Sequence, residues 1–285
     1  MFRTLGRTSH IRMVVLVLVG MAGSSTAAEA GDVHQALADG MTDEAIALLK
    51  KNPALIESRD DREMTPLHYA VEQRNLKAVK WLLSRKANVN AIDHGKFTPL
   101  YFASDRQMAE ALIKAGANLD LKDCLDMTPL LHAAEEKRQG VVDAILATGY
   151  KLDLKTALVL KKRDVVKKLL NDDPKLAKQP SPEWDLNGCH TPLGIACAQR
   201  DSEIAELLLK SGADVNEQTY MPNAGCNVSA LTNAVWVGDA VLVQLLLKYG
   251  AKTDTGGGKR ERTLLDYARK NSSPEIVALL EKAAK

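Results

Sequence analysis

Histidine is the side chain in this sequence best suited to hold a metal or to move a proton, and its copies are scattered. After residue 30 they stand at His34, His68, His94, His132 and His190. None has a second ligand at metal-binding spacing. The 285 residues also contain no Gly-x-Ser-x-Gly motif, phosphate loop or paired-carboxylate motif. The sequence therefore predicts no catalytic site, no cofactor and no bound metal.

The charge balance argues against two classes of partner. The chain has 38 Lys plus Arg and 36 Asp plus Glu. Removal of residues 1–30 would take away three Arg and one Glu and leave 35 residues of each sign. Without a basic excess there is no electrostatic case for binding nucleic acid or an anionic membrane surface.

Residues 1–30 have the layout of a secretory signal peptide. A basic start with Arg3, Arg7 and Arg12 precedes an apolar run at 13–21 (MVVLVLVGM), and small residues then lead to Ala30. This order is typical of a leader cleaved after Ala30 or two or three residues earlier. The alternative is an uncleaved N-terminus on a cytosolic protein. We expect a mature protein of residues 31–285 that is periplasmic or secreted and is not inserted in a membrane.

A four-residue motif recurs along the mature chain. The motif of residues 65–68 (TPLH) returns in whole or in part beginning at Thr98, Thr128, Thr191, Ser229 and Thr263. Each copy is followed by an alanine, then by a second apolar block that often ends in glycine. Thr caps a helix, Pro fits the first helical position, and Gly takes the left-handed conformation that ends a helix. One such helix pair cannot bury its apolar face, whereas a stack of pairs can.

This pattern resembles the ankyrin repeat over almost all of residues 31–285. The resemblance implies an all-α solenoid of stacked antiparallel helix pairs with hairpin-like turns along one edge. A repeat of about 33 residues predicts close to eight units. It also implies a protein that binds another protein through its turn tips and the exposed face of each first helix. We expect the chain alone to be a monomer.

Three units depart from the pattern. Lys86 occupies the glycine position of the second unit, so it must adopt a left-handed conformation. The third unit is three residues shorter between its Thr98 and Gly116 than the regular units. The fifth unit, near 150–188, keeps little of the motif, and its segment 169–176 resembles segment 48–55 of the first unit. We therefore expect two sub-stacks that meet near residues 150–190.

Two of the four cysteines, Cys124, Cys189, Cys197 and Cys226, are candidates for a disulfide. Cys189 and Cys226 fall in adjacent turns of the implied fold, and an oxidising compartment would favour their pairing. The bond forms only if their Cα atoms approach within about 7 Å. A zinc site built from Cys189, His190 and Cys226 lacks a clear fourth ligand.

The resemblance places a partner on the turn tips and on the outward sites of the first helices. The candidate contacts at these positions are Met64, Phe97, Met127, His94, Leu125, Glu72, Gln73, Glu135, Glu136 and Gln199. For Met64, Phe97 and Met127, packing on the next turn is an equal alternative. Trp236 should face outward and anchor a partner, unless it covers the long turn 217–228, which adds Tyr220 and Met221 as candidates.

Together these features predict a non-enzymatic protein-binding scaffold in the bacterial cell envelope. One interpretation is an immunity protein, or an inhibitor of a toxin or lipase effector. A periplasmic partner that protects or tethers an enzyme such as a catalase is the alternative, as is a secreted effector directed at a host. A hydrolase with an unrecognised site is a further class.

Overall fold

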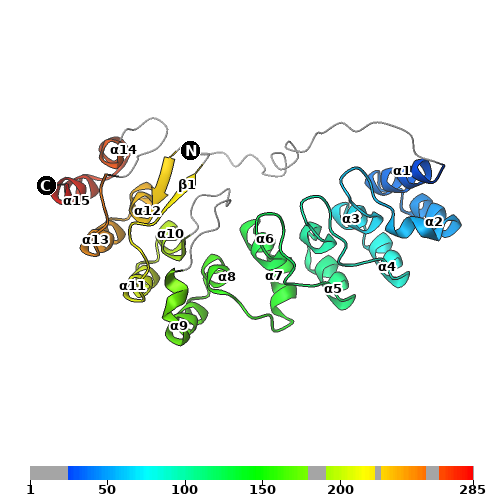
Figure 1. Ribbon diagram of the computed structural model, residues 1–285, viewed down its shortest axis with the longest axis horizontal. Coiled ribbons are helices and arrows are strands. Elements are labelled where there is room, and N and C mark those ends of the chain that lie inside the picture. The colour runs from blue at the N-terminus through cyan, green and yellow to red at the C-terminus, as the bar shows by residue number, and fades with distance from the viewer. Residues whose placement is uncertain (1–24, 179–190, 222–225, 255–262, 285) are drawn as a thin grey trace.

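The expected fold class is confirmed by the computed structural model, which describes residues 25–178, 191–221, 226–254 and 263–284. Helices dominate and stack in antiparallel pairs. Figure 1 shows a curved array running from α1 at one end to α15 at the other. The first helix of each pair lies on the inner side of the curve and the second on the outer side. We number these pairs, each with its connecting turn, as units one to eight.

The helices and strands follow the repeat. Units one to four comprise α1 (Ser25–Ala38), α2 (Thr42–Lys51) and the 3₁₀ helix η3 (Pro53–Glu57); α3 (Pro66–Glu72) and α4 (Leu76–Ser84); the 3₁₀ helix η4 (Pro99–Phe102) and α5 (Arg106–Lys114); and α6 (Pro129–Glu135) and α7 (Gln139–Leu146). Units five to eight comprise α8 (Leu154–Val159), α9 (Arg163–Asp172) and the 3₁₀ helix η5 (Pro174–Lys178); α10 (Pro192–Ala198) and α11 (Ser202–Lys210); α12 (Ala230–Val237) and α13 (Ala240–Lys248); and α14 (Leu264–Asn271) and α15 (Pro274–Ala283). Strands β1 (Gln218–Met221) and β2 (Cys226–Ser229) form an antiparallel hairpin before α12, with Gln218 opposite Ser229.

The helix starts have the expected caps. The hydroxyl of Thr128 accepts the backbone N–H of Leu131 at 3.2 Å, which satisfies one of the free donors at the start of α6. Asp201 does the same for the second helix of unit six by accepting the N–H of Ile204 at 3.2 Å. These local bonds fix where each helix begins and so align the units.

The helix ends confirm the expectation for Lys86. Gly116, Gly149, Gly212 and Gly250 have φ values between +80° and +93° at the ends of their second helices. Lys86 occupies the matching position with φ +65°. A side chain with a Cβ is strained in this region. Unit two therefore has backbone strain at the position that glycine occupies in units three, four, six and seven.

The three residues missing from the third unit shorten its first helix. Its first segment is only a four-residue 3₁₀ helix, η4, and α5 starts soon after it. This brings α5 against α7 so closely that a Cβ added at Gly140 would lie 2.9 Å from the backbone nitrogen of Arg106. Glycine at 140 is therefore required by the close approach of two helices.

The turn tips of units two to four form a regular set of hairpins. Asp60, Asp93 and Asp123 stand five residues before the motif threonines, and each accepts backbone N–H groups of its own turn. Successive tips are joined by the N–H of His94 to the carbonyl of Arg62 at 3.0 Å and by the N–H of Cys124 to the carbonyl of Gly95 at 2.9 Å. The tips thus form a continuous ladder along one edge.

The buried core consists of two clusters. One runs from Val33 to Ile145, the other from Leu154 to Leu280. Leu152 is half-buried and packs against both. The apolar interior therefore changes over between unit four and unit five, at the start of the range 150–190 where two sub-stacks were expected to meet.

The expected cleavage point lies inside a helix. α1 begins at Ser25 and continues past Ala30. The buried side chains Val33, Ala36 and Leu37 follow Ala30, so cleavage there would keep them. Cleavage itself stays a prediction. Among the described residues, no helix combines the length and apolar character needed to cross a membrane.

Candidate functional site

An aromatic cluster marks the first helices of units two to four. Tyr69, Phe102 and His132 each stand four residues after the motif threonine, and all three are half-buried. Phe97, from the tip of unit three, lies edge-on to Phe102 at 6.0 Å and to His132 at 5.7 Å between ring centroids. We call these four residues the aromatic strip. Its rings are fixed by their neighbours while part of each remains accessible.

A charged network holds one end of the strip. The Tyr69 hydroxyl donates to a carboxylate oxygen of Asp60 at 2.7 Å and accepts from the Arg62 guanidinium at 2.7 Å. The guanidinium also stacks on the Tyr69 ring, 5.4 Å from its centroid, while its side chain stays 50% exposed. Burial alone would raise the pKa of Asp60, but hydrogen bonds from Tyr69, Met64 and Arg62 outweigh it and lower that pKa. Arg62 is therefore a pre-oriented cation at the rim of the strip.

His68 ties the second unit to the third. Its Nδ1 accepts the backbone N–H of Thr65 at 3.0 Å, so the proton sits on Nε2, which donates to the Phe97 carbonyl at 3.1 Å. Burial lowers the pKa of His68 to about 4. This is the structural role that the repeat motif implies for His68, and it leaves no free imidazole for chemistry.

His132 is held by a different device. Arg138 donates to its Nδ1 at 2.5 Å and to the carbonyls of Tyr101 and Ala103 at 2.6 and 2.7 Å. These two carbonyls stand at the end of the truncated segment η4, so Arg138 replaces the helical turn that unit three lacks. Burial, followed by the charge of Arg138, lowers the pKa of His132 to about 4.

The turn-tip candidates divide by exposure. Met64 is 2% exposed and Met127 is 8% exposed, so the expectation that they project from the tips is wrong. Both side chains are buried, which favours the packing alternative. Phe97 is half-buried in the aromatic strip, His94 is exposed and Leu125 is half-buried. Of the five turn-tip candidates, Phe97, His94 and Leu125 therefore remain at least partly accessible.

The first-helix candidates are mostly accessible. Gln73 and Glu136 are exposed, and Glu72 and Glu135 are half-buried. Gln199 is the exception, because its side-chain amide donates to the carbonyl of Leu158 in unit five at 3.0 Å. Its expected role as an outward contact gives way to that of a tie between units.

A second aromatic pair lies in the last units. Trp236 is half-buried and its ring centroid lies 6.3 Å from that of Tyr267 on α14. Its indole N–H is buried and has no hydrogen-bond partner among the described residues. Trp236 is therefore packed on one face rather than fully outward. The backbone of Tyr220 and Met221 forms β1, and their side chains lie outside the described part of the structure.

The proposed cysteine pair is not tested. Cys189 lies outside the described residues, and of Cys226 only the backbone, in β2, is described. Cys124 is an exposed thiol at the tip of unit four, and Cys197 is buried in α10. The disulfide stays a prediction.

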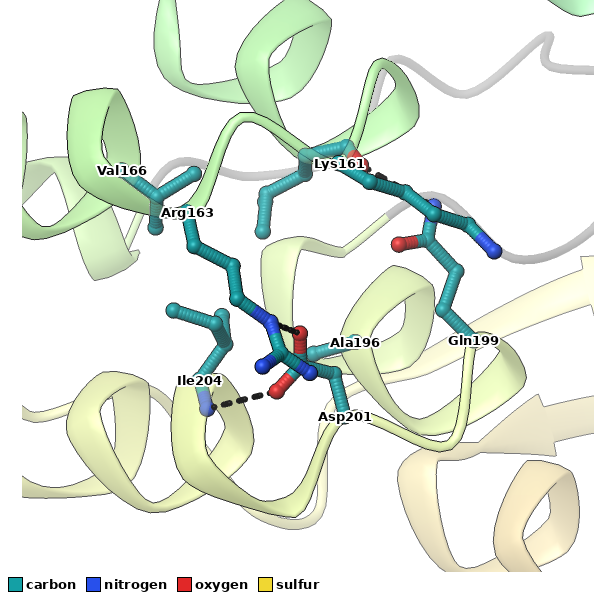
Figure 2. A pocket seen from close by; sticks show the side chains of 8 residues that line it. Lys161, Arg163, Val166, Ala196, Gln199, Asp201 and Ile204 are labelled. Atoms are coloured by element: carbon teal, nitrogen blue, oxygen red, sulfur yellow. Dashed lines mark hydrogen bonds and ion pairs between the residues drawn. The ribbon is translucent and has the colours of Figure 1, made fainter.

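A hollow between units five and six, drawn in Figure 2, illustrates the chemistry available in the interior. It has a volume of about 10 Å³, room for a single water molecule. Across it, the guanidinium Nε of Arg163 donates to a carboxylate oxygen of Asp201 at 2.7 Å. Because Asp201 also caps α11, this pair joins two units and offers no substrate space. Within the described residues, no group of three His, Cys, Asp or Glu side chains is placed to hold a metal ion.

Comparison with protein-family models decides the family. The model described as "Ankyrin repeats (3 copies)" matches residues 27–93, and the model for the single "Ankyrin repeat" matches residues 96–124 and 189–220. The matched segments of this chain are ankyrin repeats. The resemblance seen in the sequence is confirmed, and ankyrin repeats mediate binding between proteins.

Several known ankyrin-repeat proteins are similar to this chain. Ankyrin repeat domain-containing protein SAT10 of Stachybotrys chartarum is 27% identical over 252 residues, which are 88% of this chain and 11% of that protein. A putative ankyrin repeat protein of Rickettsia bellii is 30% identical over 108 residues, 35% of this chain and 31% of the relative. The crystal structure of the ankyrin repeat domain of Bcl-3 aligns with 87% of this chain and 97% of its own, at 23% identity and a TM-score of 0.44. This chain thus spans less than a third of these two sequence relatives.

Sequence reasoning missed most of the aromatic strip. It singled out Phe97 but not Tyr69, Phe102 or the role of His132. The repeat held the information, because these three residues share one motif position in three successive units. It also missed Asp60, Asp93 and Asp123, whose constant distance from the motif threonine was available in the sequence.

Proposed function

We propose that this ankyrin-repeat protein is a non-enzymatic scaffold that holds another protein against its inner face and turn edge. The observation that carries the proposal is the aromatic strip, in which Phe97 lies edge-on to Phe102 and His132, and Tyr69 holds the equivalent half-buried position in unit two. Aromatic and arginine side chains contribute most to protein interfaces, and rings already fixed by packing lose little freedom on binding. Arg62, stacked at the rim, adds a directed charge.

We propose further that the partner is an exported protein of toxin or lipase type, which the scaffold inhibits in the bacterial cell envelope. The cell-envelope location is supported by the basic, apolar and small-residue order of residues 1–30. This part is tested by sequencing the N-terminus of the protein recovered from the periplasmic fraction. A start at residue 31, or within three residues before it, agrees with the proposal. A protein that retains Met1 in the cytosol contradicts the location.

Binding is tested by capture of the tagged protein with cross-linking, followed by titration of the partner. The test variant is Tyr69→Ala with Phe102→Ala. The control is Val241→Ala, because Val241 is 65% exposed on α13 of the outer side. We expect the double variant to weaken binding at least tenfold, the effect of losing about 1.4 kcal/mol or more of interface energy.

Two checks make this result decisive. Thermal melts of each variant show whether a loss of affinity reflects unfolding. Arg62→Ala serves as a second binding variant, because it removes a half-exposed side chain outside the core. Equal capture by the double variant and by the control would contradict the proposed surface. Inhibition of a captured toxin or lipase by the protein, lost in the double variant, would support the inhibitor role.

A further inference from the structure

The contacts that join successive units are interrupted between unit four and unit five. Elsewhere the outer helices pack in sequence, α5 on α7, α9 on α11 and α11 on α13. Within the described residues, α7 and α9 make at most marginal contact, and Figure 1 shows them clearly separated. The outer layer of the stack is therefore open at this one junction.

The turn ladder also ends there. Eleven residues separate Lys86 from Thr98, enough for a hairpin tip, whereas three separate Gly149 from Asp153, the cap of α8. Unit five consequently has no tip to receive a bond of the kind that joins Arg62 to His94. The edge of the stack lacks continuity between units four and five.

A third kind of tie joins units two and three and units six and seven; within the described residues it is absent here, as it is between units three and four, where Asp120 takes the position. In unit two, Asn90 stands four residues after the left-handed residue and bonds to the next unit through both atoms of its amide. The matching position after Gly149 is Asp153, whose carboxylate accepts the N–H of Thr156 within α8. Because a carboxylate cannot donate, Asp153 cannot form the pair of hydrogen bonds that Asn90 makes with the next unit.

The remaining connection runs along the inner side. α6 packs on α8, and Leu152 touches both core clusters. A joint that is closed on one side and open on the other permits rotation about the closed side, because little buried surface is lost when the angle changes.

We propose that residues 149–153 are a hinge on which two half-stacks, residues 32–148 and 154–284, change their angle to close on a protein partner. The first half-stack carries the aromatic strip and the second carries Trp236 with Tyr267. Closure alters the distance between these two surfaces by rotation about the α6–α8 contact, beside which Leu152 packs on both clusters and Leu160 packs on the first. The partner in this statement rests on the proposed function, whereas the hinge does not.

The hinge is tested on the full chain without a partner, by electron-spin distance measurement between paired labels. The pair Ala147→Cys with Lys210→Cys spans the junction, and the matched pair Ser84→Cys with Ala147→Cys spans two unit steps within the first half-stack. These exposed residues stand at equivalent positions, two before the left-handed residues Lys86, Gly149 and Gly212. Cys124, Cys189 and Cys226 are replaced by serine, and Cys197 stays because it is 0% exposed.

We expect the distance distribution across the junction to be about twice as broad as that of the matched pair. Equal widths would overturn the hinge. If a labelled pair disturbs folding, the pairs Thr148→Cys with Ser211→Cys and Arg85→Cys with Thr148→Cys repeat the comparison one residue along, with Ser211 half-buried and the other two positions exposed. Once a partner is available, narrowing of the cross-junction distribution alone supports closure. Binding without narrowing overturns closure and leaves the proposed function standing.

Discussion

Asn90 and Asn216 make the same two hydrogen bonds in distant parts of the stack. Each donates from its side-chain amide to the carbonyl of the next unit's left-handed glycine at 3.1 Å, Gly116 or Gly250. Each also accepts a backbone N–H two residues beyond that glycine, at 2.7 Å from Asn118 and 2.8 Å from Lys252. One asparagine thus ties a pair of units in each half-stack.

Replacement of either asparagine by alanine should cost about 1–2 kcal/mol of unfolding free energy, because two backbone groups lose their partner. Asn90→Asp keeps the acceptor and loses the donor, so its cost should be smaller. Urea unfolding measures both effects, and Asn171→Ala at the exposed end of α9 is the control. If the urea midpoint of Asn90→Ala equals that of the control, these hydrogen bonds do not contribute to stability.

Lys86→Gly should raise the unfolding temperature. Glycine removes the left-handed strain at φ +65°, worth roughly 1–2 kcal/mol, but costs up to about 1 kcal/mol of backbone entropy. The net gain should be below about 1 kcal/mol. The reverse change, Gly149→Ala, should lower stability through backbone strain alone, since a Cβ there meets nothing within 4 Å. A melting temperature that falls for Lys86→Gly would contradict the strain at this position.

Gly140→Ala should destabilise the protein although alanine is the better helix former. Helix propensity alone favours alanine by about 1 kcal/mol in α7. The added Cβ, however, would lie 2.9 Å from the backbone nitrogen of Arg106, and backbone cannot swing aside as a flexible side chain can. We expect a net loss of about 1–3 kcal/mol in urea unfolding. A stabilised variant would mean that α5 and α7 separate readily.

Acid should weaken the first half-stack through His68 and His132. Both have folded-state pKa values lowered to about 4, mainly by burial. The unfolded chain binds these protons near pH 6.5, so stability is complete above that pH and is lost as the pH falls towards 4. The loss should be on the order of 2–3 kcal/mol per histidine, measured as the unfolding free energy against pH.

The variant His132→Phe separates the two contributions. Phenylalanine occupies the same motif position in unit three, as Phe102, and does not titrate. The variant should be less stable at neutral pH because Arg138 loses an acceptor, yet its stability should depend less steeply on pH. A slope equal to that of the unchanged protein would assign the acid sensitivity elsewhere.

The two cores should unfold in separate steps. Trp81 packs on the first cluster, and Trp236 lies on α12, whose buried residues belong to the second. Variants that keep either Trp81 or Trp236 as the sole tryptophan, with Trp184 also replaced, should give different urea midpoints, because the outer helices α7 and α9 do not pack across the junction. Coincident midpoints for Trp81 and Trp236 fluorescence would show that the junction transmits cooperativity.

The sequence predicted the features that repeat. The motif threonines and closing glycines located the helix pairs. Their spacing revealed that Lys86 takes a glycine position and that the third unit is short. These are local effects, in which one residue type suits one backbone conformation. The burial of Met64 and Met127 was not decided in this way, because outward projection and packing on the next turn were equal alternatives at that motif position.

Long-range ties were harder still to predict. Nothing in the sequence pairs Arg138 with the carbonyls of Tyr101 and Ala103, since the need for a donor arises only when η4 is cut short. Gln199 was expected to face outward because its motif position is outward in regular units. The irregular fifth unit beside it supplied a free carbonyl at Leu158 instead.

The fifth unit repeats the first in structure as well as in sequence. In both, a second helix ends at a residue with extended backbone, Asn52 or Asp173, and a proline then starts a 3₁₀ helix. Each half-stack therefore begins with the same kind of terminal unit. The chain has the form of two blocks in tandem, so duplication or deletion of a block at this boundary would change the number of units and would leave only the α6–α8 contact and its neighbours Leu152 and Leu160 to be replaced.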